Sequence, residues 1–386
     1  AYGSFRHPDI VPLRQIAPDK YLLELFHGPT LAFKDVAMQL LGHLLARGLA
    51  KQGKRATVIV ATSGDTGSAA IGALKGQPNV DVVVLHPQGR VSDVQRRQMT
   101  TVLDSNVHNI ALGGSFDDTQ SIVKALFADG AFVSHVGLTA VNSINFARIM
   151  AQCVYYFTAS LALGFVRPAN FVVPTGNFGD VFAGEAASRM GLPIEKLIVA
   201  TNANDILARA LRTGVYNSGT SQATLSPSMD IQVASNFERA LFEASGRDGA
   251  WVTDAMNGFA ETRRLEIQPN ALKELSMRYV AGSANDDETL ETMARFYRKN
   301  KIILDPHTAV GLAVADKLEL PAGNPLVFLA TAHPAKFPDA VARATGVRPD
   351  LSPYISDLLT REERCTELPN SVKAVRDFIV ESARAA

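Results

Sequence analysis

One lysine stands at an unusual place in the sequence. Lys34 lies in the stretch HGPTLAFKDVAMQ, between Phe33 and Asp35 and just before a helical pattern of apolar residues. The positive end of a helix dipole and the apolar neighbours both disfavour a charged ammonium group there. An amine that gives up its proton can form a Schiff base, so Lys34 is a candidate for covalent catalysis. A lysine that simply extends from a helix end into solvent is the structural alternative.

Two glycine-containing turns could each bind an anion. The first, ATSGDTGSAA (61–70), follows an apolar run and opens a helix, so its hydroxyl and backbone N–H groups could surround a negative group. The second, PTGNFGD (174–180), also lies between a strand and a helix, and its glycines allow close approach of the backbone to a phosphate. A plain turn capped by Thr62 or Ser63 is the alternative for the first segment.

Two further segments carry polar side chains at positions suited to ligand contacts. In VNSINFARIMAQ, a helix that starts near Ser143 would place Asn145 and Arg148 on one face, where they could bind a second anion. The segment FLATAHPAKF ends a buried strand at Thr331, whose hydroxyl group could face a ligand. An ordinary solvated helix face and a simple helix cap are the respective alternatives.

Other kinds of chemistry find no support in the sequence. The histidines and the two cysteines show no metal-ligand spacing, and G-x-S-x-G is absent, so neither a metal site nor a serine triad is expected. The 38 basic and 38 acidic residues balance, which argues against nucleic acid or an acidic membrane as a partner. No apolar run is long enough for a transmembrane helix. Two cysteines are too few for a disulfide framework and favour a cytoplasmic location.

Strand-like apolar runs alternate with helical patterns along the chain. The runs are 57–61, 80–86, 107–112, 170–174, 196–201 and 325–331, each followed by a helical pattern. Such strands predict parallel sheets that are covered on both faces. We therefore expect an α/β protein with two doubly wound sheets and helices on both faces. The expected smaller domain is 35–140, and 1–34 with 141–386 form the larger one. Ligands of such folds bind at the carboxyl ends of the strands.

Five short motifs, by their residues and their order along the chain, resemble those of a known family. HGPTLAFKD, TSGDTG, NSIN..R, GNFGD and TAHPAKF occur in this order. The set resembles the threonine synthases, which are pyridoxal-phosphate (PLP) enzymes of fold type II, the fold of cysteine synthase and the tryptophan synthase β subunit. The resemblance runs from about Phe5 to the C-terminus. It implies fold type II and pyridoxal 5'-phosphate as the cofactor.

The resemblance also implies roles for the residues that match the family's motifs. Lys34 matches the catalytic lysine that holds the cofactor as a Schiff base. The cofactor phosphate would be bound by Gly176, Asn177, Phe178, Gly179 and Asp180. Thr331 would face the pyridine nitrogen, and Asp65 would lie on the O3′ side, where relatives such as cysteine synthase carry an asparagine. The substrate carboxylate would meet Thr62, Ser63 and Thr66, and the substrate phosphate would meet Asn142, Ser143, Asn145 and Arg148.

The implied activity is that of a carbon–oxygen lyase of threonine biosynthesis. It converts O-phospho-L-homoserine and water to L-threonine and phosphate by γ-elimination and β-addition of water. The alternatives are a threonine/serine dehydratase-type or phospholyase-type PLP enzyme of the same fold, and a non-catalytic PLP-binding paralogue. We expect a monomer or homodimer. The additional N-terminal region that is usual in the family is expected to be missing from this chain.

Overall fold

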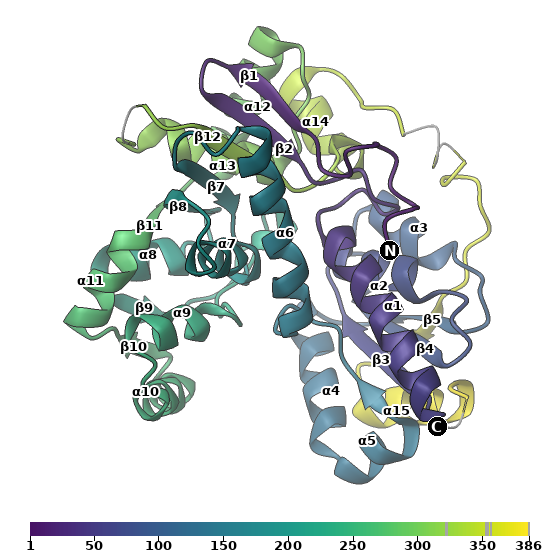
Figure 1. Ribbon diagram of the computed structural model, residues 1–386. Coiled ribbons are helices and arrows are strands. Elements are labelled where there is room, and N and C mark those ends of the chain that lie inside the picture. Colours follow the sequence, from purple (N-terminus) through teal and green to yellow (C-terminus); the bar gives the residue numbers. More distant parts are fainter. Residues whose placement is uncertain (321–322, 352–354, 356, 385–386) are drawn as a thin grey trace. The chain divides into compact units, whose positions relative to one another are not determined.

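The computed structural model describes residues 1–320, 323–351, 355 and 357–384 (Figure 1). The chain divides into two compact units. Unit 1 comprises Ala1–Arg6, Gly28–Arg148 and Asp350–Ala386, and unit 2 comprises His7–His27 and Ile149–Pro349. These units differ from the division expected from the sequence. Residues 1–6, 28–34 and 141–148 and the C-terminal segment, all expected in the larger domain, cluster with unit 1.

Unit 1 is built on a five-stranded parallel sheet with the strand order β13-β5-β4-β3-β6. Its strands are β3 (Ala56–Ala61), β4 (Val80–Pro87), β5 (Val107–Leu112), β6 (Leu138–Thr139) and β13 (Thr366–Leu368). Its helices are α1 (Lys34–Gln52), α2 (Asp65–Leu74), α3 (Asp93–Thr100), α4 (Phe116–Ala128), α5 (Gly130–Val136) and α15 (Val372–Ser382).

Both faces of the unit 1 sheet are buried. In β3, Val58 and Val60 join a cluster with apolar side chains of α1 and α2, whereas Ile59 joins a cluster with side chains of α4, α5 and α15 (Figure 1). Successive side chains of a strand point to opposite faces of the sheet. An unbroken apolar run such as TVIVA is therefore what a sheet covered on both sides requires, and the expected parallel arrangement is confirmed here.

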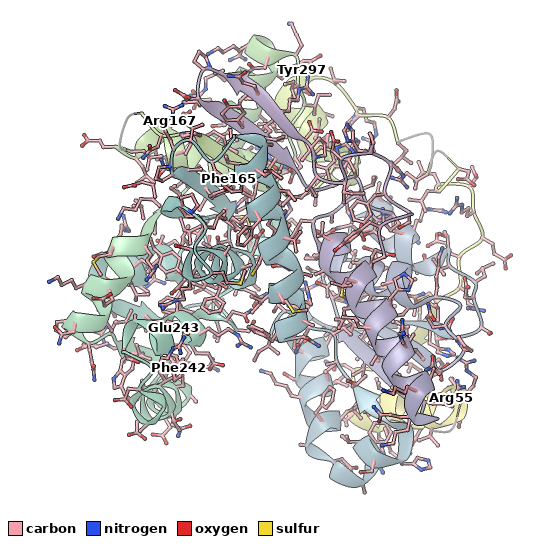
Figure 2. All side chains as sticks on the ribbon, in the orientation of Figure 1. Arg55, Phe165, Arg167, Phe242, Glu243 and Tyr297 are labelled. Carbon is pink, nitrogen blue, oxygen red and sulfur yellow. The ribbon has the colours of Figure 1, made fainter. Side chains whose placement is uncertain are left out.

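The C-terminal segment is tied to unit 1 by a buried carboxylate. Asp81 of β4 is 1% exposed and accepts hydrogen bonds from the Nε (2.9 Å) and the backbone N–H (3.2 Å) of Arg384. Arg55, which Figure 2 shows at the periphery of the unit, approaches the same carboxylate with Nη2 at 3.4 Å. Together with the pairing of β13 with β5, these bonds explain why the segment belongs to unit 1.

Unit 2 contains a six-stranded sheet with the order β1-β2-β12-β7-β8-β11 and a two-stranded sheet of β9 and β10. Its strands are β1 (Leu13–Ala17), β2 (Lys20–Glu24), β7 (Ala169–Pro174), β8 (Ile194–Thr201), β9 (Val215–Asn217), β10 (Arg264–Glu266), β11 (Tyr279–Ser283) and β12 (Leu326–Ala330). Its α-helices are α7 (Gly179–Arg189), α8 (Ile206–Thr213), α9 (Phe237–Ala244), α10 (Gly249–Thr262), α11 (Pro269–Arg278), α12 (Asp286–Asn300), α13 (Pro306–Lys317) and α14 (Pro338–Thr345). Two short 3-10 helices, η1 (Pro227–Met229) and η2 (Pro334–Lys336), and most of α6 (Phe146–Ala162) complete it.

The core of the large unit 2 sheet has the same two-sided character. Val172 and Phe328 cluster with Val310 of α13 on one face. The ring centroid of Phe171, the neighbour of Val172 in the strand, lies 4.9 Å from that of Tyr156 of α6. The strands pair in parallel except β1 and β2, whose antiparallel edge was not expected from the sequence. Within the described ranges, no helix has both the length and the apolarity needed to cross a membrane.

Arg384→Ala tests the tie between the C-terminal segment and the sheet. The substitution removes the Nε donor to the buried carboxylate and the Nη2 donor to Val80 O, while the backbone N–H of residue 384 remains. We therefore expect the free energy of unfolding to fall by about 1–3 kcal/mol in urea denaturation. Lys373→Ala is the control, because it removes only the exposed pair between Lys373 and Asp377 on α15 and should cost about 0.5 kcal/mol or less. Equal losses in the two variants would contradict the structural role of Arg384.

Candidate active site

A tight turn fixes the backbone of Lys34, the first residue of α1. Buried Asp35 accepts hydrogen bonds from the backbone N–H (2.8 Å) and the hydroxyl group (2.6 Å) of Thr30. A Cβ atom at Gly28 would lie only 2.4 Å from the Cβ of Asp35, so only glycine fits there. The glycine, the threonine and the aspartate of HGPTLAFKD thus serve one purpose, which is to set the helix start that carries the lysine.

The side chain of Lys34 is buried beside a carboxylate. It is 9% exposed, and its Nζ lies 3.6 Å from Oδ2 of Asp65, the first residue of α2. The Nζ atom also lies 5.7 Å from the ring centroid of Phe33. A carboxylate at Asp65 would therefore stabilise the ammonium form of Lys34, which the helix start and the apolar neighbours destabilise.

Thr62 holds the turn that leads to Asp65. Its Oγ1 accepts hydrogen bonds from the backbone N–H groups of Gly64 (2.9 Å) and Gly67 (3.0 Å). This is the structural role that the capping alternative gave to Thr62. Ser63 and Thr66 of the same turn are half-buried. Contacts of these three residues with a substrate carboxylate stay a prediction.

Gln95 is a site residue that the sequence analysis missed. Its Nε2 donates a hydrogen bond of 2.8 Å to Oδ1 of Asp65. Gln95 lies in the helix after β4, and Asp65 lies in the helix after β3, the adjacent parallel strand. Since the carboxyl ends of adjacent parallel strands meet at one edge, a polar residue in the first turn after strand 80–86 was the available signal.

The segment Asn142–Arg148 does not form the expected helix face. The helix start near Ser143 is wrong, because a turn closed by a bond from Asn145 N–H to Asn142 O (3.2 Å) precedes α6, which begins at Phe146. The Oδ1 of Asn145 accepts from the N–H of Ala147 (3.0 Å), so Asn145 caps the helix. Arg148 is buried and donates from Nη1 to Val141 O (3.1 Å). Both side chains hold this turn.

In unit 2, the segment after β7 forms an anion cradle at the start of α7. Phe178 adopts a left-handed backbone conformation (φ 64°) immediately before the helix. A Cβ atom at Gly176 would lie 2.6 Å from Ser228 O, so a larger residue has no room. The first N–H groups of a helix have no partner within it and favour an anion. The cradle therefore fits a phosphate group.

Ser235 and Asn236, which lie in the loop before α9, form hydrogen bonds with Asn177 of the cradle. The carbonyl oxygen of Asn177 accepts from the backbone N–H and the Nδ2 of Asn236, both at 3.1 Å. The Oδ1 of Asn177 accepts from Ser235 Oγ at 3.2 Å. Both Asn177 oxygens are thus used as acceptors, and the donors that this turn offers to an anion are its N–H groups. No local sequence signal indicated that Ser235 and Asn236 contact this turn.

Asp180 is a buried carboxyl group in the first turn of α7. Its Oδ1 accepts hydrogen bonds from the hydroxyl groups of Tyr155 and Tyr156 of α6, while its Oδ2 has no hydrogen-bond partner among the described residues. Burial raises the pKa of Asp180 to about 7, although the two tyrosine hydroxyl groups act in the opposite direction. A proton on Asp180 removes a negative charge that would otherwise stand beside the anion cradle.

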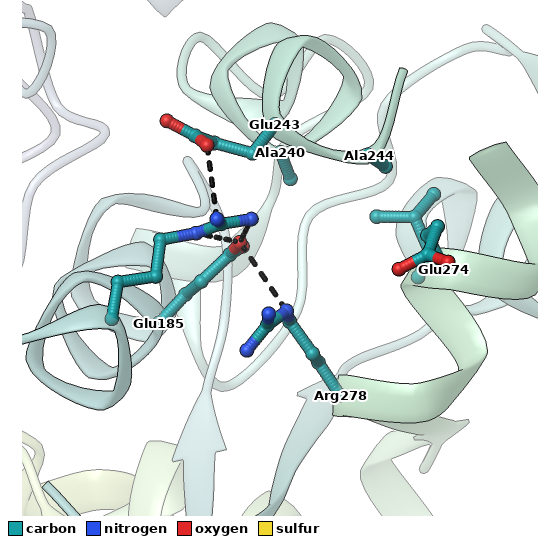
Figure 3. Close-up of a pocket in the computed structure, with 8 residues that line it drawn as sticks. Glu185, Ala240, Glu243, Ala244, Glu274 and Arg278 are labelled. Carbon is teal, nitrogen blue, oxygen red and sulfur yellow. Dashed lines mark hydrogen bonds and ion pairs between the residues drawn. The ribbon is translucent and has the colours of Figure 1, made fainter. Parts of the chain in front are cut away.

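The other half of α7 is anchored by a second buried carboxylate, Glu185 (Figure 3). It accepts hydrogen bonds from the hydroxyl group of Tyr279 and from Arg189 Nε (2.8 Å), and Arg278 approaches at 3.7 Å. Arg189 also contacts Glu243 of α9 at 3.1 Å. Burial raises the pKa of Tyr279 well above its usual value, so this hydroxyl remains a donor.

Thr331 lies at the same sheet edge as the cradle. It is buried and directly follows β12, which pairs in parallel with β7 in the register Phe328↔Val172. Thr331 thus lies at the strand end, as expected from the sequence, and the contact of its hydroxyl group with a ligand stays a prediction. In the part of the chain that the structure describes, no three histidine, cysteine, aspartate or glutamate side chains are grouped to hold a metal ion.

A buried lysine with a carboxylate beside it, and a glycine-rich cradle after a parallel strand, suit a PLP-dependent enzyme of fold type II. A family model described as pyridoxal-phosphate dependent enzyme matches residues 10–275. A second model, described as threonine synthase, C-terminal, matches residues 308–379. The fold class and the cofactor expected from the motifs are confirmed by these matches.

Comparison with individual proteins narrows the class. The chain is 52% identical over 380 residues to threonine synthase from Pseudomonas aeruginosa, a match that covers 98% of this chain and 81% of the relative. The PLP-bound threonine synthase from Brucella melitensis has a TM-score of 0.96 at 52% identity, covering 100% of this chain and 83% of that one. Yeast threonine synthase has a TM-score of 0.92 at 39% identity, with coverages of 99% and 82%. The chain belongs to the threonine synthase family.

Asp180→Asn tests the buried carboxyl group through the pH dependence of stability. The folded-state pKa of about 7 exceeds the usual 3.8, so folded protein holds a proton that unfolded protein releases between these values. Stability conferred by this group is therefore present at low pH and is lost as pH rises toward 7. Relative to Asp180→Asn, the wild-type free energy of unfolding should fall by roughly 2 kcal/mol between about pH 5.5 and about pH 7.5. Parallel curves from urea denaturation of the two proteins would refute a raised pKa.

Proposed function

We propose that this chain catalyses the conversion of O-phospho-L-homoserine and water to L-threonine and phosphate. Lys34 carries the proposal, because it is a buried lysine at a helix start with a carboxylate 3.6 Å from its amine. The membership of the threonine synthase family supports the same reaction. We further propose that the enzyme acts in the cytoplasm, in line with two cysteines that are not disulfide-bonded, as a monomer or homodimer.

Pyridoxal phosphate, when bound, supplies an electron sink for negative charge that develops on the substrate carbons. Lys34 Nζ would bind the cofactor carbonyl carbon, and the backbone N–H groups of Gly176–Asp180 would bind its phosphate. The hydroxyl of Thr331 would face the ring nitrogen. A threonine, unlike an aspartate, does not keep that nitrogen protonated, which favours controlled elimination and replacement.

Lys34 would also move the protons of the reaction. With the substrate amine in its place on the cofactor, Nζ would be the free base that takes a proton from Cα. After giving that proton up, Nζ would again be a free base and would take a proton from Cβ. Asp65 Oδ2, at 3.6 Å, stabilises the ammonium group formed on Nζ at each step. The substrate carboxylate would be bound by Thr62, Ser63 and Thr66, and the substrate phosphate by Asn142, Ser143, Asn145 and Arg148.

The experiment that tests this function is an assay of both products. The purified protein, loaded with pyridoxal phosphate, is incubated with O-phospho-L-homoserine, and phosphate and threonine are measured together. Equal amounts of the two support the proposal. Phosphate accompanied by 2-oxobutyrate instead would indicate a phospholyase-type or dehydratase-type activity. A coloured protein that yields neither product would indicate a non-catalytic paralogue.

Lys34→Ala tests the assignment of the cofactor lysine. We expect loss of the visible absorption band of the bound cofactor and at least about a thousandfold loss of phosphate release, because no amine remains to bind the carbonyl or move protons. Lys51→Ala, at the other end of α1, is the matched control and should keep both. Borohydride reduction and peptide mapping of the wild type should place the pyridoxyl group on Lys34, and any other position would rule the assignment out.

Arg148→Ala tests the proposed site for the substrate phosphate. We expect KM for O-phospho-L-homoserine to rise roughly tenfold or more, because a charge-assisted contact is lost and the turn that Arg148 holds is loosened. The cofactor band should persist. Arg148→Lys keeps the charge without the planar fork and should give an intermediate KM. An unchanged KM in both variants, with the cofactor bound, would exclude this role.

A further inference from the structure

Gln95 is nearly fully buried in the first turn of α3, with 1% of its surface exposed. The stretch Ser92–Gln95 has the S-x-x-Q spacing of a capping box, in which the glutamine side chain would return to the backbone N–H of the serine. The structure shows a different arrangement. The backbone N–H of Gln95 donates to Ser92 Oγ (3.3 Å), but its side-chain amide reaches α2 instead.

The two ends of the Gln95 amide have different partners, which fixes its orientation. The hydroxyl group of Ser92 donates to Oε1 at 3.0 Å. The Nε2 group donates to Oδ1 of Asp65 at 2.8 Å, and the other carboxylate oxygen, Oδ2, lies 3.6 Å from Nζ of Lys34. A directed series of polar contacts therefore runs from the start of α3 through Asp65 to the lysine, and all of it lies within unit 1.

The backbone around the amide leaves it little freedom. Gly64 has a φ of 135°, and a Cβ atom there would lie 2.6 Å from Cδ of Gln95. Thr62 holds the same turn through its bonds to Gly64 and Gly67. The amide is thus enclosed by the turn that carries Asp65, and a change of its orientation would require this turn to move.

We propose that Gln95 is a positioning residue that keeps Asp65 ionised and turned toward Lys34. A donor to one carboxylate oxygen favours the charged form of the acid, and the charged form in turn favours a proton on the nearby lysine nitrogen. Gln95 acts through Asp65 and touches neither Lys34 nor a reacting atom in the described contacts. The inference rests on the proposed function, in which Lys34 holds the cofactor.

The charged groups near this series come from three helices. Lys34 belongs to α1 and Asp65 to α2, while Asp35 of α1 is engaged by Thr30. On α3, Arg96 follows Gln95 and is paired with Glu363 and Asp93. Gln95 itself carries no charge, so its influence on the lysine is exerted by hydrogen bonding alone. This allows a substitution series to separate hydrogen bonding from charge.

The test measures the visible absorption of the cofactor-loaded protein as a function of pH, which reports protonation of the nitrogen that links Lys34 to the cofactor. In Gln95→Met the donor is lost, and we expect the midpoint of this titration to fall by about one pH unit. In the isosteric Gln95→Glu the new carboxyl group and Asp65 share a proton, because two carboxylates this close do not both ionise, so the pair keeps one negative charge and the midpoint should stay closer to that of the wild type than in Gln95→Met. A merely structural role of Gln95 would leave the midpoint unchanged in every variant that binds the cofactor.

Gln98→Met is the matched control, since Gln98 is a buried glutamine of the same helix whose Nε2 donates to Thr30 O (3.1 Å) instead of Asp65. Its midpoint should stay within about 0.2 pH unit of the wild type. If Gln95→Met fails to bind the cofactor, Gln95→Ala, which also lacks the donor, is measured in its place. A midpoint of the variant without the donor that coincides with the wild type, or that rises, would overturn the inference.

The same protein distinguishes this failure from failure of the proposed function. Borohydride reduction of the wild type reports whether the cofactor is bound to Lys34 at all. A pyridoxyl group on Lys34 with unchanged midpoints in the Gln95 variants refutes only the role of Gln95. A pyridoxyl group on another residue refutes both.

Discussion

The structure of unit 1 depends on one electrostatic constraint, the placement of a buried amine at the positive end of a helix. Neither the helix dipole nor the apolar neighbours of Lys34 favour its charged form. The charged form is stabilised instead by Asp65, whose Oδ2 lies 3.6 Å from Nζ. The turn around Gly28 packs against Asp35, which follows Lys34, and the turn around Gly64 packs against Gln95, so a side chain at either glycine would displace a neighbour of the pair.

Unit 2 meets the complementary requirement, a rigid helix start for an anion. The helix α7 is held near its beginning by Asp180 with two tyrosines and further along by Glu185 with Tyr279. Phe178 in the cradle packs 5.3 Å from the ring of Tyr279, so the second anchor also supports the cradle. Hydrogen-bond donors that are already held in place bind an anion without a cost of reorganisation. The anchoring of α7 would therefore strengthen anion binding at its first turn. Burying the carboxyl groups is tolerated because each accepts hydrogen bonds from buried hydroxyl groups.

What could be predicted from the sequence is what is encoded locally. Apolar runs identified β3, β4, β5, β7, β8 and β12, because strands covered on both faces need consecutive apolar residues. The features that were missed depend on partners far along the chain: Gln95 bonds a residue 30 positions away, and Asn236 one 59 positions away. The start of α6 was missed for another reason, since the turn closed by Asn145 competes locally with a helix that would begin at Ser143. The C-terminal segment joins unit 1 through Arg384 and Asp81, and the pattern of apolar residues in the sequence does not predict this pairing.

The presence of an aspartate rather than an asparagine at position 65 follows from the same constraint. An asparagine can orient a lysine but cannot neutralise its charge. In the proposed reaction one amine removes a proton from Cα and later another from Cβ. A carboxylate at 3.6 Å stabilises the ammonium group each time it forms, which makes Lys34 a stronger base. Such a carboxylate is useful only while it stays ionised, and the donor from Gln95 at 2.8 Å favours that form. The aspartate and the glutamine therefore make chemical sense together.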